Sequence, residues 1–357
     1  MKLIHCSDIH LDSRMESNLS PQQARERNME LCDTFGHLVA YAREEGVAAV
    51  LISGDLFDTG RVRSATVRLV LDILAQAPEI DFLYLRGNHD EGGALLEGTS
   101  LPKNLKLFTP EWSTHRYGSV AVTGAVLTRE NAHSLYDTLS LDPEDMNIVM
   151  LHGQDSTQTG EDLVCLPQLK GKNIRYLALG HLHSYREGTL DHWGTWCYSG
   201  CLEGRGFDEC GEKGFVLLDI DSNRLTSTFV PFAKRTLHEV DVDITGCETV
   251  GELRDALQSA AGEIPRKDLV KFVLRGTYTL DSQKDIPLLT AFFRDRWYFS
   301  KIKDESTLQL DKASYEHDAS LKGEFIRKVM ASPLSPEDKE TVIRAGLMAL
   351  SGEEVTL

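Results

Sequence analysis

Five short apolar runs in this chain are each followed at once by residue types that bind metal ions. Apolar runs that stop at glycine or at a polar cluster are typical of buried β-strands. In α/β sheets, ligands bind just beyond the carboxyl ends of such strands, so several strand ends can share one crevice. The pattern therefore predicts an α/β fold with a common site. Its candidate residues are Asp8, His10, Asp55, Asn88, His89, His152, His181 and His183.

The segments between the first apolar runs predict helices. A Ser-Pro pair at Ser20 is typical of a helix start, and Gly46 predicts that this helix ends at Glu45. A second helix is expected at about residues 63–77, before the next apolar run, and residues 131–139 also look helical. Strand, helix and strand in this order indicate a βαβ arrangement.

Length and composition indicate a globular chain with several parts. It has 357 residues, of which 41% are hydrophobic and 26% charged, whereas a domain usually has about 150 residues. The pattern of strands and turns changes near Pro231. We therefore expect a sheet-rich first domain over residues 1–232, a small α/β domain over 233–310 and a helical segment over 311–357.

The types of candidate ligand indicate the chemistry. Oxygen and imidazole ligands without cysteine suit Mn²⁺, Fe²⁺ or Zn²⁺, and seven such residues are too many for one tetrahedral zinc ion. Two ions that share one carboxylate would account for seven candidate ligands. Asp55 is the natural bridge between the two ions, because its strand end is central. Two metal ions about 3.5–4 Å apart can hold a hydroxide and clamp a phosphoryl group. The sequence therefore predicts phosphoester hydrolysis.

His89 and Asp90 are the candidate catalytic residues. His89 directly follows Asn88, so the two side chains diverge and His89 can face the substrate as an acid or as a stabiliser of charge. Asp90 can orient the His89 ring, as carboxylates near a metal centre do, or it can cap a helix. Both roles for Asp90 remain open at this point.

The motifs around these residues resemble, in order and spacing, those of the calcineurin-like metallophosphoesterases. The resemblance implies a four-layer α/β/β/α fold with two facing sheets, followed by a small capping domain. It also implies that one metal ion is bound by Asp8, His10, Asp55 and His183, and the other by Asp55, Asn88, His152 and His181. His89 would be the catalytic histidine. The motifs are Asp8-Ile9-His10, Gly54-Asp55-Leu56-Phe57-Asp58, Gly87-Asn88-His89-Asp90, His152-Gly153 and Gly180-His181-Leu182-His183.

Three segments are similar to the SbcD-type DNA repair exonuclease branch of this family, and within this branch the chain length and the helical C-terminal stretch are most similar to the YhaO-like bacterial proteins. The three segments are residues 5–11, residues 54–60 and residues 198–205. Two positions depart from that branch. Cys201 stands where serine is common, and Asp58 stands where archaeal and eukaryotic relatives have a histidine near the metal ions. The resemblance implies a DNA exonuclease or endonuclease subunit of a DNA repair complex.

The charge of the chain does not favour a DNA substrate. There are 38 basic and 55 acidic side chains, a net charge of −17, whereas contacts from Lys and Arg to phosphates supply most non-specific affinity for DNA. A local groove of basic side chains would offset this, although each one also fits a solvated surface position. These residues are Arg61, Arg63, Arg86, Lys103, Arg129, Arg186 and Arg205. The alternatives are a phosphodiesterase or phosphatase for small nucleotides or phosphoproteins, and a non-catalytic scaffold.

The expected partners follow from the family resemblance. They are DNA, a coiled-coil SMC-like ATPase and a second copy of the chain. Residues 21–45 and 63–77 are the candidates for homodimer contacts. The apolar C-terminal stretch from Phe325 to Leu350 either docks the ATPase or packs on its own fold. Because the sequence shows no cationic leader and no apolar stretch near the roughly 18 residues of a membrane span, we expect a cytoplasmic protein without membrane contact.

Overall fold

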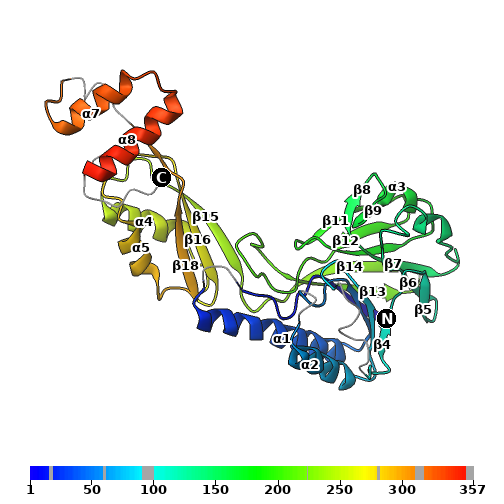
Figure 1. The fold of residues 1–357 in the computed structure, drawn as a ribbon. Helices are drawn as coiled ribbons and strands as arrows, with labels where there is room; N and C mark the ends of the chain where they lie inside the picture. Colours follow the sequence, from blue (N-terminus) through cyan, green and yellow to red (C-terminus); the bar gives the residue numbers. More distant parts are fainter. Residues whose placement is uncertain are drawn as a thin grey trace. The chain divides into compact units, whose positions relative to one another are not determined.

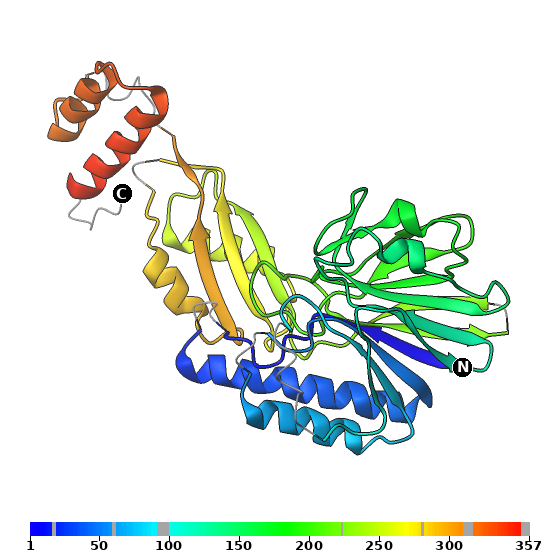
Figure 2. The ribbon, with the colours of Figure 1, turned by 45° about the vertical axis from the view of Figure 1, so that its right-hand side comes forward.

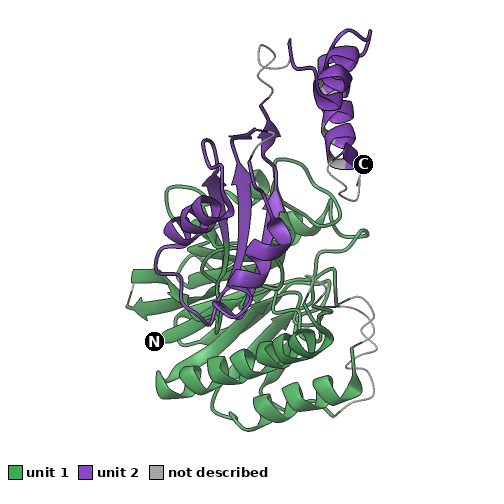
Figure 3. Cartoon of the chain, turned by 90° about the vertical axis from the view of Figure 1, so that its left-hand side faces the viewer, with its two compact units in different colours: residues 1–238 green, residues 239–357 purple. Residues whose placement is uncertain are grey.

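A computed structural model describes residues 1–15, 19–58, 62–90, 100–222, 224–279, 282–309 and 317–350. The chain forms two compact units, Met1–His238 and Glu239–Leu357 (Figure 3). The three-part division expected from the sequence stays a prediction, and its boundary at residues 310 and 311 lies outside the described residues, as does Arg61.

The first unit contains a six-stranded sheet in which the predicted N-terminal strands lie side by side. Its order is β14-β13-β1-β2-β3-β4. Strands β1 to β4 are parallel to one another, and β13 is antiparallel to both of its neighbours, β1 and β14. Because Cys6 pairs with Ile52 and Ser53 pairs with Leu85, the strands end at one edge. The strands are β1 Lys2–Cys6, β2 Val47–Ser53, β3 Asp81–Leu85, β4 Leu105–Leu107, β13 Gly214–Asp221 and β14 Arg224–Pro231.

Two helices connect the parallel strands and lie beside each other on the outer face of this sheet (Figures 1 and 2). Helix α1 spans Pro21–Glu44 and helix α2 spans Ser64–Ala75, which confirms both predicted helices. The Ser20 side chain accepts a hydrogen bond from the backbone N–H of Gln23, whose side chain in turn accepts one from the backbone N–H of Ser20. This reciprocal cap fixes the start of α1.

A second six-stranded sheet supplies the later strand ends. Its order is β11-β12-β10-β7-β6-β5, and β6, β7, β10 and β12 are parallel. Gly180 at the end of β10 pairs with His152 at the end of β7, so the histidine motifs meet at the same edge. The strands are β5 Ser113–Tyr117, β6 Val120–Gly124, β7 Met146–His152, β10 Tyr176–Gly180, β11 Arg186–Thr189 and β12 Thr195–Tyr198.

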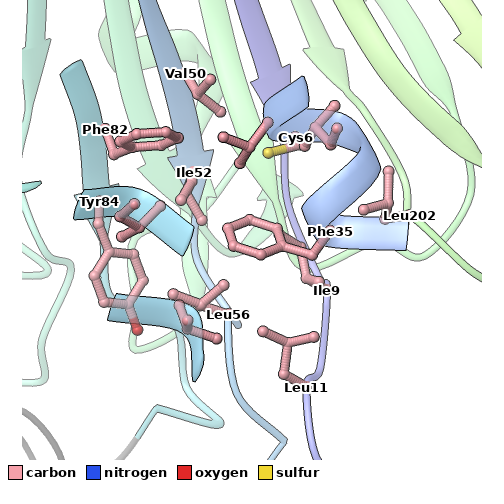
Figure 4. Packing of buried hydrophobic residues seen from close by; sticks show 14 of the residues in the cluster. Cys6, Ile9, Leu11, Phe35, Val50, Ile52, Leu56, Phe82, Tyr84 and Leu202 are labelled. Carbon is pink, nitrogen blue, oxygen red and sulfur yellow. The ribbon is translucent and has the colours of Figure 1, made fainter. Parts of the chain in front are cut away.

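Three buried clusters hold these layers together. Leu51 of the first sheet and Met150 of the second belong to the cluster between the sheets. On the outer face of the first sheet, Phe35 of α1 packs among Cys6 and Ile52 (Figure 4). The third cluster lies over the outer face of the second sheet. The predicted four-layer α/β/β/α fold is thus confirmed.

The fourth layer differs in detail from the sequence expectation. The segment predicted as one helix over residues 131–139 contains only a short 3-10 helix, Leu135–Thr138. The one-turn helix α3, Leu166–Leu169, and the strands β8, Gln154–Ser156, and β9, Leu163–Cys165, complete the connections on this side. The short 3-10 helix is enough to bury Leu135 and Tyr136, so this segment does not need a full α-helix.

The second unit has its own core. A three-stranded sheet of order β15-β16-β18 packs with helices α4 and α5 around Phe272 and Phe293. None of the helices in the described part of the chain is both long and apolar enough to cross a membrane. The elements are β15 Leu237–Asp243, α4 Val250–Ala261, β16 Leu269–Arg275, β17 Thr277–Tyr278, α5 Ile286–Phe293, β18 Phe299–Asp304, β19 Thr307–Leu308, α7 Leu321–Met330 and α8 Pro336–Leu350.

Candidate metal centre

The loops that follow the strand ends adopt an unusual backbone that turns their side chains into one site. Asp8, His10, Asp55 and His181 all have positive φ angles, of 51°, 48°, 51° and 109°. Such conformations are costly for residues other than glycine, so surrounding contacts must hold them. The backbone N–H of Asp8 donates to the Gly54 carbonyl at 3.1 Å, and that of His10 to the Asp55 carbonyl at 3.0 Å. The first two loops are therefore fixed to each other.

Asp8, His10 and His183 form the first half of the centre. Each offers a donor atom, and these atoms all lie within 4.8 Å of one another. The Nε2 atoms of His10 and His183 are 3.2 Å apart, and His183 Nε2 is 4.0 Å from Asp8 Oδ1. Asp8 is buried and its carboxylate also accepts the backbone N–H of His181 at 3.0 Å.

Asn88, His152 and His181 form the second half of the centre. Asn88 Oδ1 lies 2.9 Å from His152 Nε2 and 3.4 Å from His181 Nδ1. The two imidazole rings are perpendicular, with centroids 5.5 Å apart. Burial and the neighbouring His152 lower the pKa of His181, so its ring nitrogens favour the neutral form that binds metal ions.

Asp55 lies between the two halves. Its Oδ2 atom is 3.8 Å from His10 Nε2 and 3.5 Å from His152 Nε2, while its Oδ1 atom accepts the backbone N–H of His89 at 2.9 Å. Asp55 is buried, with 1% of its surface exposed. One carboxylate oxygen thus faces donors of both halves, which is the position that a bridging ligand needs.

The hydrogen bonds around the histidines fit bound cations. Nδ1 of His183 faces Glu209 Oε1 at 2.7 Å, and Nδ1 of His152 faces the Ser53 carbonyl at 2.9 Å. These oxygens can only accept, so both Nδ1 atoms carry a hydrogen and both Nε2 atoms are left to face the centre. Burial disfavours the charged ring of His183, but the hydrogen bond to Glu209 raises its pKa. The Nε2 atoms of His183 and His10, 3.2 Å apart, are close enough to share one cation. Nitrogen and oxygen donors without a thiolate suit borderline or hard divalent ions.

Two glycines are required for the loops to approach this closely. A Cβ atom on Gly54, whose φ is 98°, would lie 2.0 Å from His152 Nδ1. A Cβ atom on Gly87 would lie 2.1 Å from Asp55 Oδ1. No side chain fits at such distances, so glycine at these positions is part of the geometry of the site.

The His89 side chain is exposed beside the first half of the centre. Its Nδ1 atom is 2.9 Å from the Asp58 carbonyl oxygen, which fixes the hydrogen on Nδ1 and leaves Nε2 facing outward. Its ring lies edge-on to His10, with centroids 4.9 Å apart. The structure therefore places the predicted catalytic histidine next to the ligand cluster and orients its ring through a backbone carbonyl.

Asp90 is buried beneath this loop. Its carboxylate accepts the backbone N–H groups of Phe57 at 3.0 Å and Gly87 at 2.9 Å. Burial raises the pKa of this carboxyl group, against the effect of these hydrogen bonds. Among the described residues, Asp90 thus links the loop after β3 to the loop after β2, whereas the contact that orients the His89 ring comes from Asp58.

Three charged residues lie beside the first half: Arg205, which the sequence indicated only as a candidate for a basic groove, and Asp58 and Glu209, which had no predicted role at the centre. Arg205 Nη1 is 3.1 Å from Asp58 Oδ1, and Arg205 Nη2 is 2.6 Å from Glu209 Oε1. Burial opposes the ionised form of Glu209, but hydrogen bonds from His183 and Arg205 hold the pKa of this carboxyl group well below its usual range. A glutamate after the last histidine motif has no fixed spacing that a single sequence can reveal.

The predicted basic residues that the structure describes, which exclude Arg61, have different partners. Arg86 and Arg129 line a cavity of about 350 Å³ that also includes the candidate ligands Asn88 and His152. Arg63 pairs with Asp12, and Arg186 pairs with Asp155 at 3.2 Å. Of the predicted basic residues, Arg86 and Arg129 therefore share a cavity with the second half, together with the acidic residues Asp90, Glu130, Glu161 and Asp162.

The sequence profile of the calcineurin-like phosphoesterase family matches residues 1–185, just over half of the chain. The chain therefore belongs to this family, and the family predicted from the five motifs is confirmed. It is a metal-dependent phosphoesterase of a dinuclear metal-binding family.

Similar proteins include several with names that refer to DNA repair. The uncharacterised metallophosphoesterase YhaO of Bacillus subtilis is 27% identical, over 78% of this chain and 72% of its own length. The DNA double-strand break repair protein Mre11 of Methanopyrus kandleri is 25% identical over 78% of this chain, which spans only 65% of that relative. The Mre11 protein of Saccharolobus solfataricus is 23% identical over 99% of this chain and 96% of its own length.

Proposed function

We propose that this phosphoesterase is a DNA exonuclease or endonuclease that uses two Mn²⁺ ions and acts as a subunit of a DNA repair complex. The observation that carries the proposal is the position of Asp55, whose Oδ2 atom faces His10 at 3.8 Å and His152 at 3.5 Å. This arrangement fits two ions that act together on one phosphoryl group. Relatives named as DNA double-strand break repair proteins support DNA as the substrate.

In this proposal the two halves of the centre hold one ion each. Asp8, His10 and His183 hold the first ion, Asn88, His152 and His181 hold the second, and Asp55 binds both. When bound, the ions lower the pKa of water for attack and neutralise charge on the phosphate. Fe²⁺ and Zn²⁺ suit the same donors.

His89 is the proposed acid at the edge of the centre. Its Nδ1–H group donates to the Asp58 carbonyl, so its Nε2 atom is the one that faces a substrate. A protonated Nε2 donates to the leaving oxygen as the phosphoester bond breaks, or stabilises the negative charge that develops there. Asp90 supports this role indirectly, because it holds the loop that carries His89.

The proposed partners are DNA, a coiled-coil SMC-like ATPase and a second copy of the chain, in a cytoplasmic complex. A partner with a basic surface would reconcile a DNA substrate with the net charge of −17. Arg86 and Arg129, in the cavity beside Asn88, are the proposed contacts of this chain to DNA phosphates.

A second candidate function is a phosphodiesterase or phosphatase for small nucleotides or phosphoproteins. The net charge of −17 favours it, because a small substrate needs no basic track along the surface. The cavity of about 350 Å³ beside the second half accommodates one nucleotide-sized group.

A substrate panel tests these candidates. The purified chain is incubated with Mn²⁺ and with linear double-stranded DNA, single-stranded DNA, a chromogenic phosphodiester or a chromogenic phosphomonoester. The nuclease proposal predicts that DNA and the phosphodiester are cleaved and that EDTA abolishes both activities. Turnover of the phosphomonoester alone would refute the nuclease. Cleavage of the small phosphodiester without any cleavage of DNA would favour the second candidate.

A further inference from the structure

A closed ring of side chains joins His10 to His183 around the first half of the centre. His10 Nδ1 is 3.2 Å from Asp58 Oδ1, which is 3.1 Å from Arg205 Nη1. Arg205 Nη2 is 2.6 Å from Glu209 Oε1, which is 2.7 Å from His183 Nδ1. The 3.2 Å approach of the two Nε2 atoms closes the ring. At the nitrogen that faces away from the centre, His183 thus has a hydrogen bond to Glu209, whereas His10 has the Asp58 carboxylate close by without hydrogen-bond geometry.

The ring is largely removed from water. The side chains of Asp58 and Arg205 are each 17% exposed, and that of Glu209 is 4% exposed. A partly buried guanidinium between two carboxylates is held in a fixed orientation, because its donors match both acids. Without Arg205, the two carboxylates would face each other unneutralised.

The ring also connects segments that are far apart in the sequence. Asp58 follows β2 of the first sheet, whereas Arg205 and Glu209 follow β12 of the second. The backbone N–H of Arg205 donates to Glu209 Oε2 at 2.7 Å. Lys213 Nζ donates to the His183 carbonyl at 2.9 Å. His183 is therefore held both through its ring and through its backbone.

The second half has a different kind of support. The outward nitrogen of His152 donates to the Ser53 carbonyl at 2.9 Å, a neutral backbone group. His181 points its Nδ1 atom at Asn88 Oδ1, within the centre itself. A carboxylate behind a ligand histidine makes the imidazole a stronger donor and fixes its orientation, whereas a carbonyl only fixes the orientation.

We propose that Asp58, Arg205 and Glu209 are positioning residues that preorganise the first half, so that its ion binds before and more tightly than the ion of the second half. The inference rests on the two-ion centre of the proposed function, but not on the choice of substrate. Fixed ligands lose less freedom when the ion binds, and the charge of the carboxylates is transmitted through the imidazoles to the ion.

Calorimetric titration of Mn²⁺ into the metal-stripped full-length chain tests this inference. The wild type should bind two ions per chain in two resolved steps. Arg205→Met should weaken the tighter step by about 10–100-fold, the usual range for groups behind metal ligands, and should change the weaker step by less than about twofold. Arg205→Lys should restore only part of the loss, because an ammonium cannot bridge both acids in the same way.

Two further variants keep the test decisive. Asp58→Asn preserves shape and should weaken the same step, even if Arg205→Met does not fold. Arg116→Met removes the ion pair that Arg116, on β5 and away from the centre, forms with Asp145, and should leave both steps unchanged.

Three results would overturn the inference: an unchanged tighter step in Arg205→Met, an equal weakening of both steps, or a single class of Mn²⁺ sites in the wild type. Equal weakening with a lower melting temperature would identify a purely structural ring. The substrate panel separates this failure from failure of the proposed function, since a chain that binds Mn²⁺ as expected but cleaves no DNA refutes only the nuclease.

Discussion

The two halves of the metal centre have similar ligands but unlike surroundings. Behind the first half, His183 is backed by Glu209 and the nearby charge of Arg205. Behind the second, His152 is backed by the carbonyl of Ser53. Charged groups can tune the strength of a ligand, whereas a backbone carbonyl is supplied by the sheet itself and cannot be changed by substitution. The comparison predicts that substitutions behind the first half change the affinity for its ion, whereas the support of His152 in the second half depends on the backbone of the sheet.

The largest effect is expected where the halves meet. Asp55→Asn should remove high-affinity binding of both ions and lower the rate of phosphodiester hydrolysis at least about 10⁴-fold, because both ions act on one phosphoryl group. Asparagine tolerates the positive φ of Asp55, so the backbone is not the cause. Asp12→Asn is the matched control, since Asp12 has a φ of 70°. Elemental analysis that still found two ions per chain would contradict the bridging assignment.

His89→Gln should separate chemistry from metal binding. We expect kcat for a phosphodiester to fall by roughly 10²–10³-fold, the usual contribution of a positioned acid. Both Mn²⁺ binding steps should remain within about twofold of the wild type, because the backbone N–H of His89, not its ring, contacts Asp55. Unchanged kcat would rule out the acid role, and loss of an ion would show that the ring is a ligand.

Gly54→Ala should disturb the second half more than the first, in which the Gly54 carbonyl accepts the backbone N–H of Asp8. The added Cβ atom would lie 2.0 Å from His152 Nδ1, and we expect about 1–3 kcal/mol loss of stability and a weaker second Mn²⁺ step. Gly46→Ala is the control, because Gly46 also has a positive φ but has nothing within 4 Å of its Cβ position. Equal weakening of both Mn²⁺ steps would argue against independent support of the two halves.

The smallest effect is expected from a change in the scaffold that touches neither half. Ser20→Ala removes the cap of α1 and should cost about 1 kcal/mol in the free energy of unfolding, measured by urea denaturation. Both Mn²⁺ steps should stay unchanged, and Ser20→Asp should recover most of the stability. A change in either step would show that α1 is coupled to the centre.

Local patterns in the sequence predicted the scaffold well. The cap at Ser20 and the glycine at Gly46 marked both ends of α1, because capping is a matter of neighbouring backbone and side-chain groups. The segment 131–139 shows the limit, since periodicity predicts a helix there and the chain forms a 3-10 turn. Packing of Leu135 and Tyr136 on the second sheet decides that outcome.

The candidate site was predictable only in part. Strand ends brought the ligand residues to one edge, which the sequence indicated. The contacts behind the candidate ligands could not be predicted from the sequence. Asp58 and Arg205 are separated by 147 positions, and the 3.1 Å between their side chains depends on how the two sheets pack. The role of Asp90 was left open for the same reason, since its partners Phe57 and Gly87 lie on different loops.

The sequence by itself determined the donor types, their order along the chain and their places after apolar strands, because these depend on side-chain chemistry and on the period of each strand. Only the tertiary structure decided the distances between these donors, including those of Asp55 to His10 and His152, and placed Arg205 and Glu209 beside His183. The physical reason is the distance along the chain over which each interaction acts. Strand formation and capping act between near neighbours, whereas the distances between ligands are set by the packing of two sheets that meet only in the folded chain.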